Sequence, residues 1–425
     1  MSGKLHFDTL QVHAGRSKDQ SNGPCVTPIY QTASFLFDDV SQAADIFALK
    51  RDGNTYTRLS NPTTETLERR IAALEGGTAG TAVASGNSSQ FITFQQICRP
   101  GDHIVACKSL YGGTFNLLNQ TFKQLGVDCT FVEGSPESFE KALRPDTKAC
   151  YVETIGNSDF FVPDFDAISG ICSKAGIPLI VDNTFGGGGY LFRPAEHGAN
   201  VVTDSLTKWI GGHGTSIGGI LTDAGNFDWG NGKFPQIDSP CESAHGLNFW
   251  RKYGDRAFAV MAKEIGVRDW GCCISPFNAF LILEGVETLS LRMQREMDNA
   301  MELAEWLEKI PKVESVNYPG LDRHPSHTTA EKYFRNGFGA VMSITLKGNR
   351  EQTAGFVNRL QLISHLANVG DNRTLVIQPA ATTHAQLDGE ELHAAGISEG
   401  TLRLSVGIEN IEDIKADIEQ SLEKL

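Results

Sequence analysis

Lys208 lies in a short segment whose residue types suit imine chemistry. The segment DSLTKWIGGHG follows the apolar run NVVT and places the hydroxyls of Ser205 and Thr207 beside the lysine. Two hydroxyls can bind phosphate oxygens, while a desolvated amine can attack a carbonyl carbon. The plainer interpretation is a solvated surface lysine, since most lysines are exposed.

A carboxylate and a glycine-started helix follow two other apolar runs. Asp182 ends PLIVD, where its burial would be costly unless a cation or a donor faced it. A protonated pyridine nitrogen is such a cation, and the alternative is a cap of the following turn. Gly86 and Asn87 open a predicted helix after TAVAS, and the free amides of a helix start attract phosphate, although many such helices bind no ligand.

Three further side chains would complete a site for pyridoxal 5'-phosphate (PLP). Tyr111 in SLYGGT could stack on the ring, and Asn157 after YVETI could donate to a phenolate oxygen. Arg403 in TLRLSVGIE could bind a substrate carboxylate, or pair with Glu409 instead. A tyrosine at such a position more often belongs to the hydrophobic core than to a ligand site, and an asparagine more often forms a turn. The combination, rather than any one residue, indicates a PLP enzyme acting on a small amino acid.

The elements that must position these residues predict an α/β fold with a mainly parallel sheet between helices. Asn61 can cap a helix that begins at Pro62, and Gly76 can end it. Short apolar runs then alternate with helix-length segments, which is typical of βαβ units. These segments are 86–97, 114–125 and 164–175. Loops at the carboxyl ends of parallel strands line a common crevice, so the candidate residues should meet there.

Changes in hydrophobic periodicity and predicted secondary structure divide the chain into three parts. Residues 1–60 carry little periodicity and predict an extended arm, with one short helix near 41–50, that contacts a neighbouring subunit. Residues 61–255 form the predicted large PLP-binding domain. Residues 256–425 predict a long linking helix and a smaller C-terminal α/β domain.

The charge, apolar runs and cysteine spacing of the chain argue against several classes of partner and site. The chain has 425 residues and a formal net charge of -14, which argues against nucleic acid as a partner. No apolar run approaches a membrane span, and the N-terminus MSGKLHFDTL lacks the order of a signal peptide, so we expect a cytoplasmic protein with no membrane partner. Nine cysteines without a CxxC pair predict neither a disulfide framework nor a metal site.

Long motifs resemble the Cys/Met-metabolism family of fold-type I PLP-dependent transferases, and within it O-acetylhomoserine sulfhydrylases of the fungal type. The resemblance runs nearly end to end, and its motifs are highly specific for the family. Examples are YTRLSNPTTETLERRIAALEGG, SLYGGTFN, ETIGN, IPLIVDNTFG, SLTKWIGGHGTSIGGI, SPFNAFLILEGVETLSLRM, HLANVGD and RLSVGIE.

The resemblance implies a role for each candidate residue. Lys208 would form the internal aldimine and shuttle protons, Asp182 would pair with the pyridinium, and Tyr111 would stack on the ring. Arg403 would bind the substrate α-carboxylate, with Asn368 of HLANVGD nearby. The implied phosphate ligands are Ser205, Thr207, the amides of Gly86 and Asn87, and, from a neighbouring subunit, Tyr56 and Arg58. Tyr56 would also contact substrate, and the family implies a dimer with shared sites that assembles into a homotetramer.

The reaction implied is γ-replacement on O-acetyl-L-homoserine, in which acetate leaves, a vinylglycine-type intermediate forms and sulfide adds at Cγ to give homocysteine. The alternative is γ-replacement with a carbon or other nucleophile that forms a non-proteinogenic amino acid in fungal secondary metabolism, and departures from the family pattern motivate it. They are Asn87 for Met or Gln, Ser158 for Pro, Leu206 for Ala, Asp204 for His, and Gln378 for His or Ala. A γ-lyase is less favoured because Phe115 and Asn116 follow SLYGGT where many lyases carry a cysteine. An inactive PLP-binding paralogue would lack a core group, and none is missing.

Overall fold

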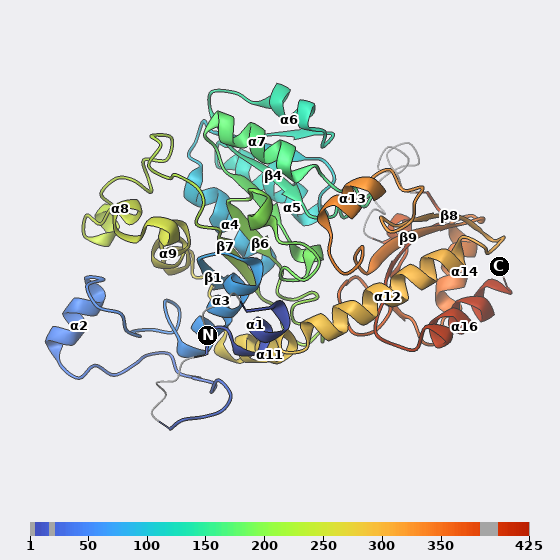
Figure 1. Ribbon diagram of the computed structural model, residues 1–425, viewed down its shortest axis with the longest axis horizontal. Coiled ribbons are helices and arrows are strands. Elements are labelled where there is room, and N and C mark those ends of the chain that lie inside the picture. The colour runs from blue at the N-terminus through green and yellow to red at the C-terminus, as the bar shows by residue number, and fades with distance from the viewer. Residues whose placement is uncertain (1–4, 17–21, 383–397, 425) are drawn as a thin grey trace.

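Two sheets organise the chain in the computed structural model, which describes residues 5–16, 22–382 and 398–424 (Figure 1). The larger sheet has the strand order β1-β7-β6-β5-β4-β2-β3, and the smaller has the order β10-β11-β12-β9-β8. The larger sheet consists of β1 (Ala79–Val83), β2 (His103–Cys107), β3 (Asp128–Val132), β4 (Thr147–Glu153), β5 (Leu179–Asp182), β6 (Val201–Asp204) and β7 (Gly219–Asp223). The smaller consists of β8 (Val313–Asn317), β9 (Val341–Leu346), β10 (Ser364–His365), β11 (Leu375–Ile377) and β12 (Thr401–Ser405).

The larger sheet confirms the prediction of a mainly parallel arrangement. Strands β2 to β6 pair in parallel, whereas β7 runs antiparallel to both β1 and β6. The apolar run of β7 could not reveal this direction, because a buried strand has the same composition in either orientation. The parallel strands β4, β5 and β6 therefore end at one edge, where Glu153, Asp182 and Asp204 are the last strand residues.

Helices cover both faces of the larger sheet because successive strand residues enter opposite cores. In β5, Ile180 packs into one core and Val181 into the other, and both are fully buried. Helix α3 begins as predicted, with Asn61 accepting from the Thr63 amide at 3.0 Å, and ends at Gly76, whose φ is 79°. One face carries α3 (Pro62–Glu75), α6 (Pro136–Ala142), α7 (Phe165–Ala175) and α11 (Pro276–Val286). The other carries α4 (Gly86–Ile97), α5 (Gly112–Asn116), a π-helical turn at Leu117–Phe122, α8 (Phe249–Tyr253) and α9 (Ala257–Met261).

The predicted linking helix is two helices. α11 ends at Val286, and α12 (Leu289–Leu307) begins after Thr288, whose φ of -119° lies outside the helical range. The first turns of α12 pack into the core of the larger sheet, and its later turns pack on the smaller sheet (Figure 1). The other helices near the smaller sheet are α13 (His327–Tyr333), α14 (Arg350–Arg359) and α16 (Ile411–Leu422). The domain boundary at residue 255 stays a prediction.

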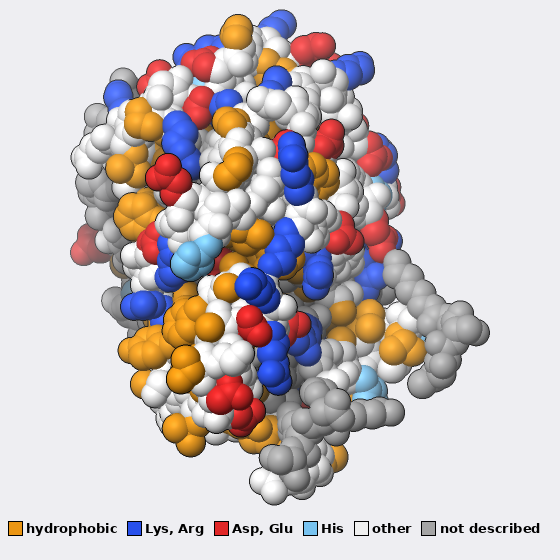
Figure 2. All heavy atoms as spheres, turned by 90° about the vertical axis from the view of Figure 1, so that its left-hand side faces the viewer, with side chains coloured by type: hydrophobic (Ala, Val, Ile, Leu, Met, Phe, Trp, Pro, Cys, Tyr) orange, Lys and Arg blue, Asp and Glu red, His pale blue; other side chains and the backbone are white. Residues whose placement is uncertain are grey.

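The N-terminal arm is only partly detached from the body. An unpredicted helix, α1 (Phe7–His13), docks on α12 through two hydrogen bonds of 3.0 Å between Gln11 and Ser290. The predicted short helix is α2 (Val40–Phe47), which projects from the body (Figure 1). Apolar side chains around it are exposed, including Leu36 and Val40, and the face of the molecule on this side carries apolar groups between charged ones (Figure 2). Among the helices of the described ranges, none has the length and hydrophobicity to cross a membrane.

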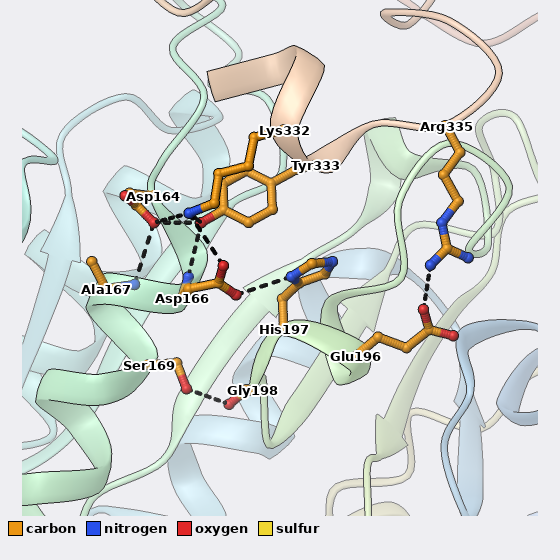
Figure 3. A network of polar contacts seen from close by, with 10 residues as sticks. All are labelled: Asp164, Asp166, Ala167, Ser169, Glu196, His197, Gly198, Lys332, Tyr333 and Arg335. Carbon is orange, nitrogen blue, oxygen red and sulfur yellow. Dashed lines mark hydrogen bonds and ion pairs between the residues drawn. The ribbon is translucent and has the colours of Figure 1, made fainter. Parts of the chain in front are cut away.

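A polar network ties α13 to the start of α7 (Figure 3). The Tyr333 hydroxyl donates to Asp164, accepts from the Asp166 amide at 3.1 Å and accepts from Lys332 at 2.7 Å. His197 hydrogen-bonds to Asp166 at 3.0 Å. Burial and the bond to Asp164 raise the pKa of Tyr333 to about 12. The hydroxyl is therefore a neutral donor and acceptor that links the two parts of the chain.

Removal of that hydroxyl should destabilise the protein. We expect Tyr333→Phe to lower the free energy of unfolding by about 1–2 kcal/mol, because the Asp164 carboxylate and the Asp166 amide lose a partner. Urea denaturation followed by circular dichroism measures the change. Tyr190→Phe, which removes a single bond to half-buried Gln294, is the matched control and should cost less. Equal unfolding midpoints for wild type and Tyr333→Phe would contradict the assigned role.

Candidate active site

A cavity of about 280 Å³ lies where the strand ends of the larger sheet face the smaller one. Its walls come from the loops after β4, β5 and β6, from the start of α4, and from residues of the C-terminal part. Ten predicted residues line it: Gly86, Asn87, Tyr111, Asn157, Asp182, Ser205, Thr207, Lys208, Asn368 and Arg403. Of the five departures from the family pattern, Asn87 alone belongs to this lining, so the others reach the cavity at most through their neighbours.

Lys208 is half-buried in the cavity wall rather than solvated. Its Nζ donates to Asn368 Oδ1 at 2.5 Å, which brings the amine and the C-terminal segment together. Burial, and secondly the positive charge of Arg403, lower the pKa of the Lys208 amine to about 8. An amine with this pKa is substantially neutral, and therefore nucleophilic, close to physiological pH.

This shift predicts an early onset of Lys208 reactivity in the PLP-free protein. The reaction of its amine with trinitrobenzenesulfonate should be half-maximal near pH 8, whereas an ordinary lysine titrates near pH 10.4. Peptide mapping of the modified site across pH measures the curve. Arg403→Gln should move the midpoint upward, because removal of the neighbouring cation favours the protonated amine. A wild-type midpoint near pH 10 would refute the shift.

Asp182 is buried in the cavity wall at the end of β5. Its Oδ2 accepts from Gln90 Nε2 at 2.7 Å and from the Tyr151 hydroxyl at 3.3 Å, while Oδ1 accepts from the Thr184 amide at 2.9 Å. The carboxylate thus caps the turn, as the alternative interpretation predicted, and also borders the cavity. Burial raises its pKa despite these donors. A cation in the cavity would stabilise the charged form, and the pyridinium nitrogen of PLP meets that requirement.

The start of α4 and the turn before Lys208 form the other end of the cavity. A side chain on Gly86 would bring its Cβ to 2.8 Å from Ser205 Cβ, so only glycine permits this approach. The first-turn amides of α4 and the Ser205 hydroxyl border the same space, which suits a phosphate. Thr207 also lines it, although its hydroxyl already bonds to the backbone of Gly218 at 3.1 and 3.2 Å.

Arg403 and Asn157 meet across the two parts of the chain. Arg403 Nη1 donates to Asn157 Oδ1 at 3.0 Å. Glu409, the alternative partner of Arg403, instead accepts from the Thr374 hydroxyl and amide. Within the described ranges no carboxylate pairs with the Arg403 guanidinium, which lines the cavity where an anionic substrate group could bind.

Two predicted residues lie elsewhere. Tyr56 is 46% exposed on the arm, and the Arg58 guanidinium lies 5.4 Å from the centre of its ring. Neither lines the cavity of its own chain. The role of Tyr56 and Arg58 in the site of a neighbouring subunit therefore stays a prediction.

Sequence reasoning overlooked Gln90 and Glu153. Both line the cavity, and Gln90 also accepts a bond of 3.0 Å from Thr114 besides its bond to Asp182. A helical spacing of four residues from Gly86 could have indicated Gln90. Glu153 ends β4 in the same way that Asp182 ends β5, so the rule applied to Asp182 could have identified it.

An α/β fold whose cavity unites a desolvated lysine, a buried strand-end aspartate and a glycine-started helix defines a PLP-dependent enzyme of fold type I. The chain matches the model of the Cys/Met metabolism PLP-dependent enzymes over residues 8–423, and it belongs to that family. PLP is accordingly its cofactor, and the residues lining the cavity fit it.

Named relatives cover almost the entire chain. Homocysteine synthase of Schizosaccharomyces pombe is 49% identical over 98% of this chain and 98% of its own length. O-acetyl-L-homoserine sulfhydrylase 1 of Thermus thermophilus is 48% identical over 98% of this chain and 100% of its own. The metY crystal structure from Campylobacter jejuni, which contains N'-pyridoxyl-lysine-5'-monophosphate, superposes with a TM-score of 0.94, 35% identity and coverage of 99% and 100%.

Proposed function

We propose that this protein catalyses γ-replacement on O-acetyl-L-homoserine, with acetate as the leaving group and sulfide as the nucleophile, to give homocysteine. The observation that carries the proposal is the position of the Lys208 amine in one cavity with Asp182 and Arg403. The names of relatives that are nearly half identical over almost the full chain support the choice of substrate and nucleophile.

When bound, PLP supplies an electron sink that stabilises negative charge at the substrate Cα. Lys208 would take the Cα proton and then a Cβ proton, so that acetate can leave from Cγ, and would return protons to Cβ and Cα after the nucleophile has added; this role suits an amine with a pKa of about 8. Arg403 would bind the α-carboxylate and hold the substrate in one orientation. Asp182 would keep a proton on the ring nitrogen, and the Asn368 carbonyl would orient the Lys208 amine.

We also propose a cytoplasmic homo-oligomer in which the arm completes a neighbouring site. Tyr56 and Arg58 would reach the phosphate region of a second subunit, and two such dimers would form the tetramer. The exposed apolar side chains around α2 support the assignment, because a partner subunit would remove them from water.

A second candidate is γ-replacement with a carbon or other nucleophile. Asn87 favours it, because this departure from the family pattern is exposed and lies in the cavity lining. Two relatives named Sulfhydrylase FUB7, from Gibberella moniliformis and Fusarium oxysporum, are each 46% identical over 99% of this chain. A different side chain at this position could admit a nucleophile other than sulfide.

Product analysis decides between these candidates. Purified PLP-loaded enzyme should convert O-acetylhomoserine and sulfide to homocysteine faster than it consumes any member of a panel of carbon nucleophiles. Mass spectrometry identifies the amino-acid products. The sulfide assignment would be overturned if the enzyme formed homocysteine only at trace rates and formed a carbon-linked product rapidly. Release of ammonia without any nucleophile would indicate a γ-lyase.

A further inference from the structure

Glu153 is a buried acid in the cavity wall to which the mechanism above gives no role. It ends β4 directly opposite Asp182 in the β4–β5 register, and the two residues are 7% and 8% exposed. Side chains at paired positions of neighbouring parallel strands lie side by side on one face of the sheet. Two neighbouring carboxyl groups do not both ionise readily in a buried site, so one of them favours its protonated form.

The surroundings of the two groups indicate which of them is neutral. Asp182 has side-chain donors in Gln90 and Tyr151, and it is the residue proposed to face the ring cation. Glu153 Oε1 accepts a hydrogen bond of 2.7 Å from the Tyr111 N–H, and the Asn157 N–H lies near the same carboxyl group. Burial, and secondly the charge of Asp182, raise the pKa of Glu153 well above its ordinary value. The negative charge therefore belongs on Asp182, and Glu153 is a neutral acceptor.

The bond from the Tyr111 N–H holds the Tyr111 segment at the end of β4, beside the loop that carries Asn157. The Tyr111 side chain is 48% exposed, so packing alone does not hold its ring, and a side chain on Gly113 would come within 2.4 Å of ring atom Cε1. The position of the ring therefore depends on the Tyr111 backbone. A second link between the same segments is the bond of 2.7 Å from Ser109 Oγ to Asp159 Oδ2.

We propose that Glu153 is a positioning residue, whose carboxyl group accepts from the Tyr111 N–H, anchors the Tyr111 segment to the end of β4 and so places the Tyr111 side chain against the PLP ring. The inference deepens the proposed function and rests on its placement of PLP in this cavity. Glu153 itself takes no part in proton transfer to the substrate.

Three substitutions test whether Glu153 acts as a hydrogen-bond acceptor of the right length or through a negative charge. Glu153→Gln keeps the length and a neutral acceptor, Glu153→Ala removes the acceptor, and Glu153→Asp withdraws it by one methylene group. We expect Glu153→Ala and Glu153→Asp to weaken PLP binding about tenfold and to speed amide hydrogen exchange at Tyr111 by a similar factor. Glu153→Gln should stay close to wild type in both. Absorbance titration of the PLP-free protein and exchange of the Tyr111 peptide measure these effects without any turnover.

The matched control is Glu133→Ala, which removes an exposed acid just after β3 that pairs with Lys108. It should leave both readouts unchanged. Wild-type PLP affinity and Tyr111 exchange in Glu153→Ala would overturn the inference. So would a Glu153→Gln variant that is as impaired as Glu153→Asp. If Glu153→Ala does not fold, the comparison of Glu153→Gln with Glu153→Asp decides the question. Turnover of O-acetylhomoserine by wild type is measured separately. Failure of that assay contradicts the proposed function but does not alter the exchange result.

Discussion

Replacing Lys208 by alanine is expected to lower the turnover of O-acetylhomoserine at least about a thousandfold, which makes it the most damaging of the substitutions considered. The amine is proposed to move protons at both Cα and Cβ, so its loss affects more than one step. No other lysine lines the cavity in the described part of the chain. Single-turnover absorbance and product formation measure the loss.

The variant should still fold and bind PLP, because Asp182, Ser205 and the start of α4 are untouched. Borohydride reduction of the PLP-loaded wild type, followed by peptide mapping, should place the pyridoxyl group on Lys208. Lys347→Ala, which removes a lysine outside the cavity lining whose amine donates to the Pro311 carbonyl, is the matched control and should keep full activity. Labelling of a different lysine, or an active Lys208→Ala enzyme, would refute the assignment.

Replacing Asp182 by asparagine should lower turnover about a hundredfold. Asparagine has nearly the same size, and it can still accept a bond from Gln90 or the Thr184 amide, so the wall of the cavity should persist. It cannot supply the negative charge that holds a proton on the ring nitrogen. We therefore expect a fall in kcat with little change in KM, since the charge stabilises the transition state more than it binds the substrate.

The absorbance spectrum of bound PLP in Asp182→Asn should respond to pH differently from wild type, because the ring nitrogen loses its partner. The control is Asp128→Asn, an exposed aspartate at the start of β3 in the same sheet. It should change neither kcat nor the spectrum. A full-rate Asp182→Asn enzyme would show that the ring nitrogen needs no anionic partner.

Most elements of the fold are predictable because their signals are local. Helix α3 begins after the capping residue Asn61, with Pro62 as its first residue, and ends at Gly76, whose backbone adopts a positive φ. The structure confirms both ends. Strand runs such as PLIVD are recognisable because buried parallel strands are continuously apolar. The direction of β7, the docking of α1 and the break between α11 and α12 escape such reasoning, because long-range packing decides them.

The candidate site was predictable to the extent that its residues follow strands. The rule that strand ends line the crevice identifies Asp182 and the Lys208 turn, and it extends to Glu153, which ends β4. Other parts rest on pairings between distant segments. The bond between Lys208 and Asn368 joins residues 160 positions apart, and no local pattern indicates it.

The sequence by itself determined which chemical groups are available and which strand ends carry them, because side-chain identity and local periodicity are written along the chain. Only the tertiary structure decided which groups face one another. It gave Arg403 the partner Asn157 rather than Glu409, set Glu153 beside Asp182, and left Tyr56 outside the cavity of its own chain. The physical reason is that proximity, burial and pKa depend on strand order and register, which arise from contacts between segments far apart in sequence.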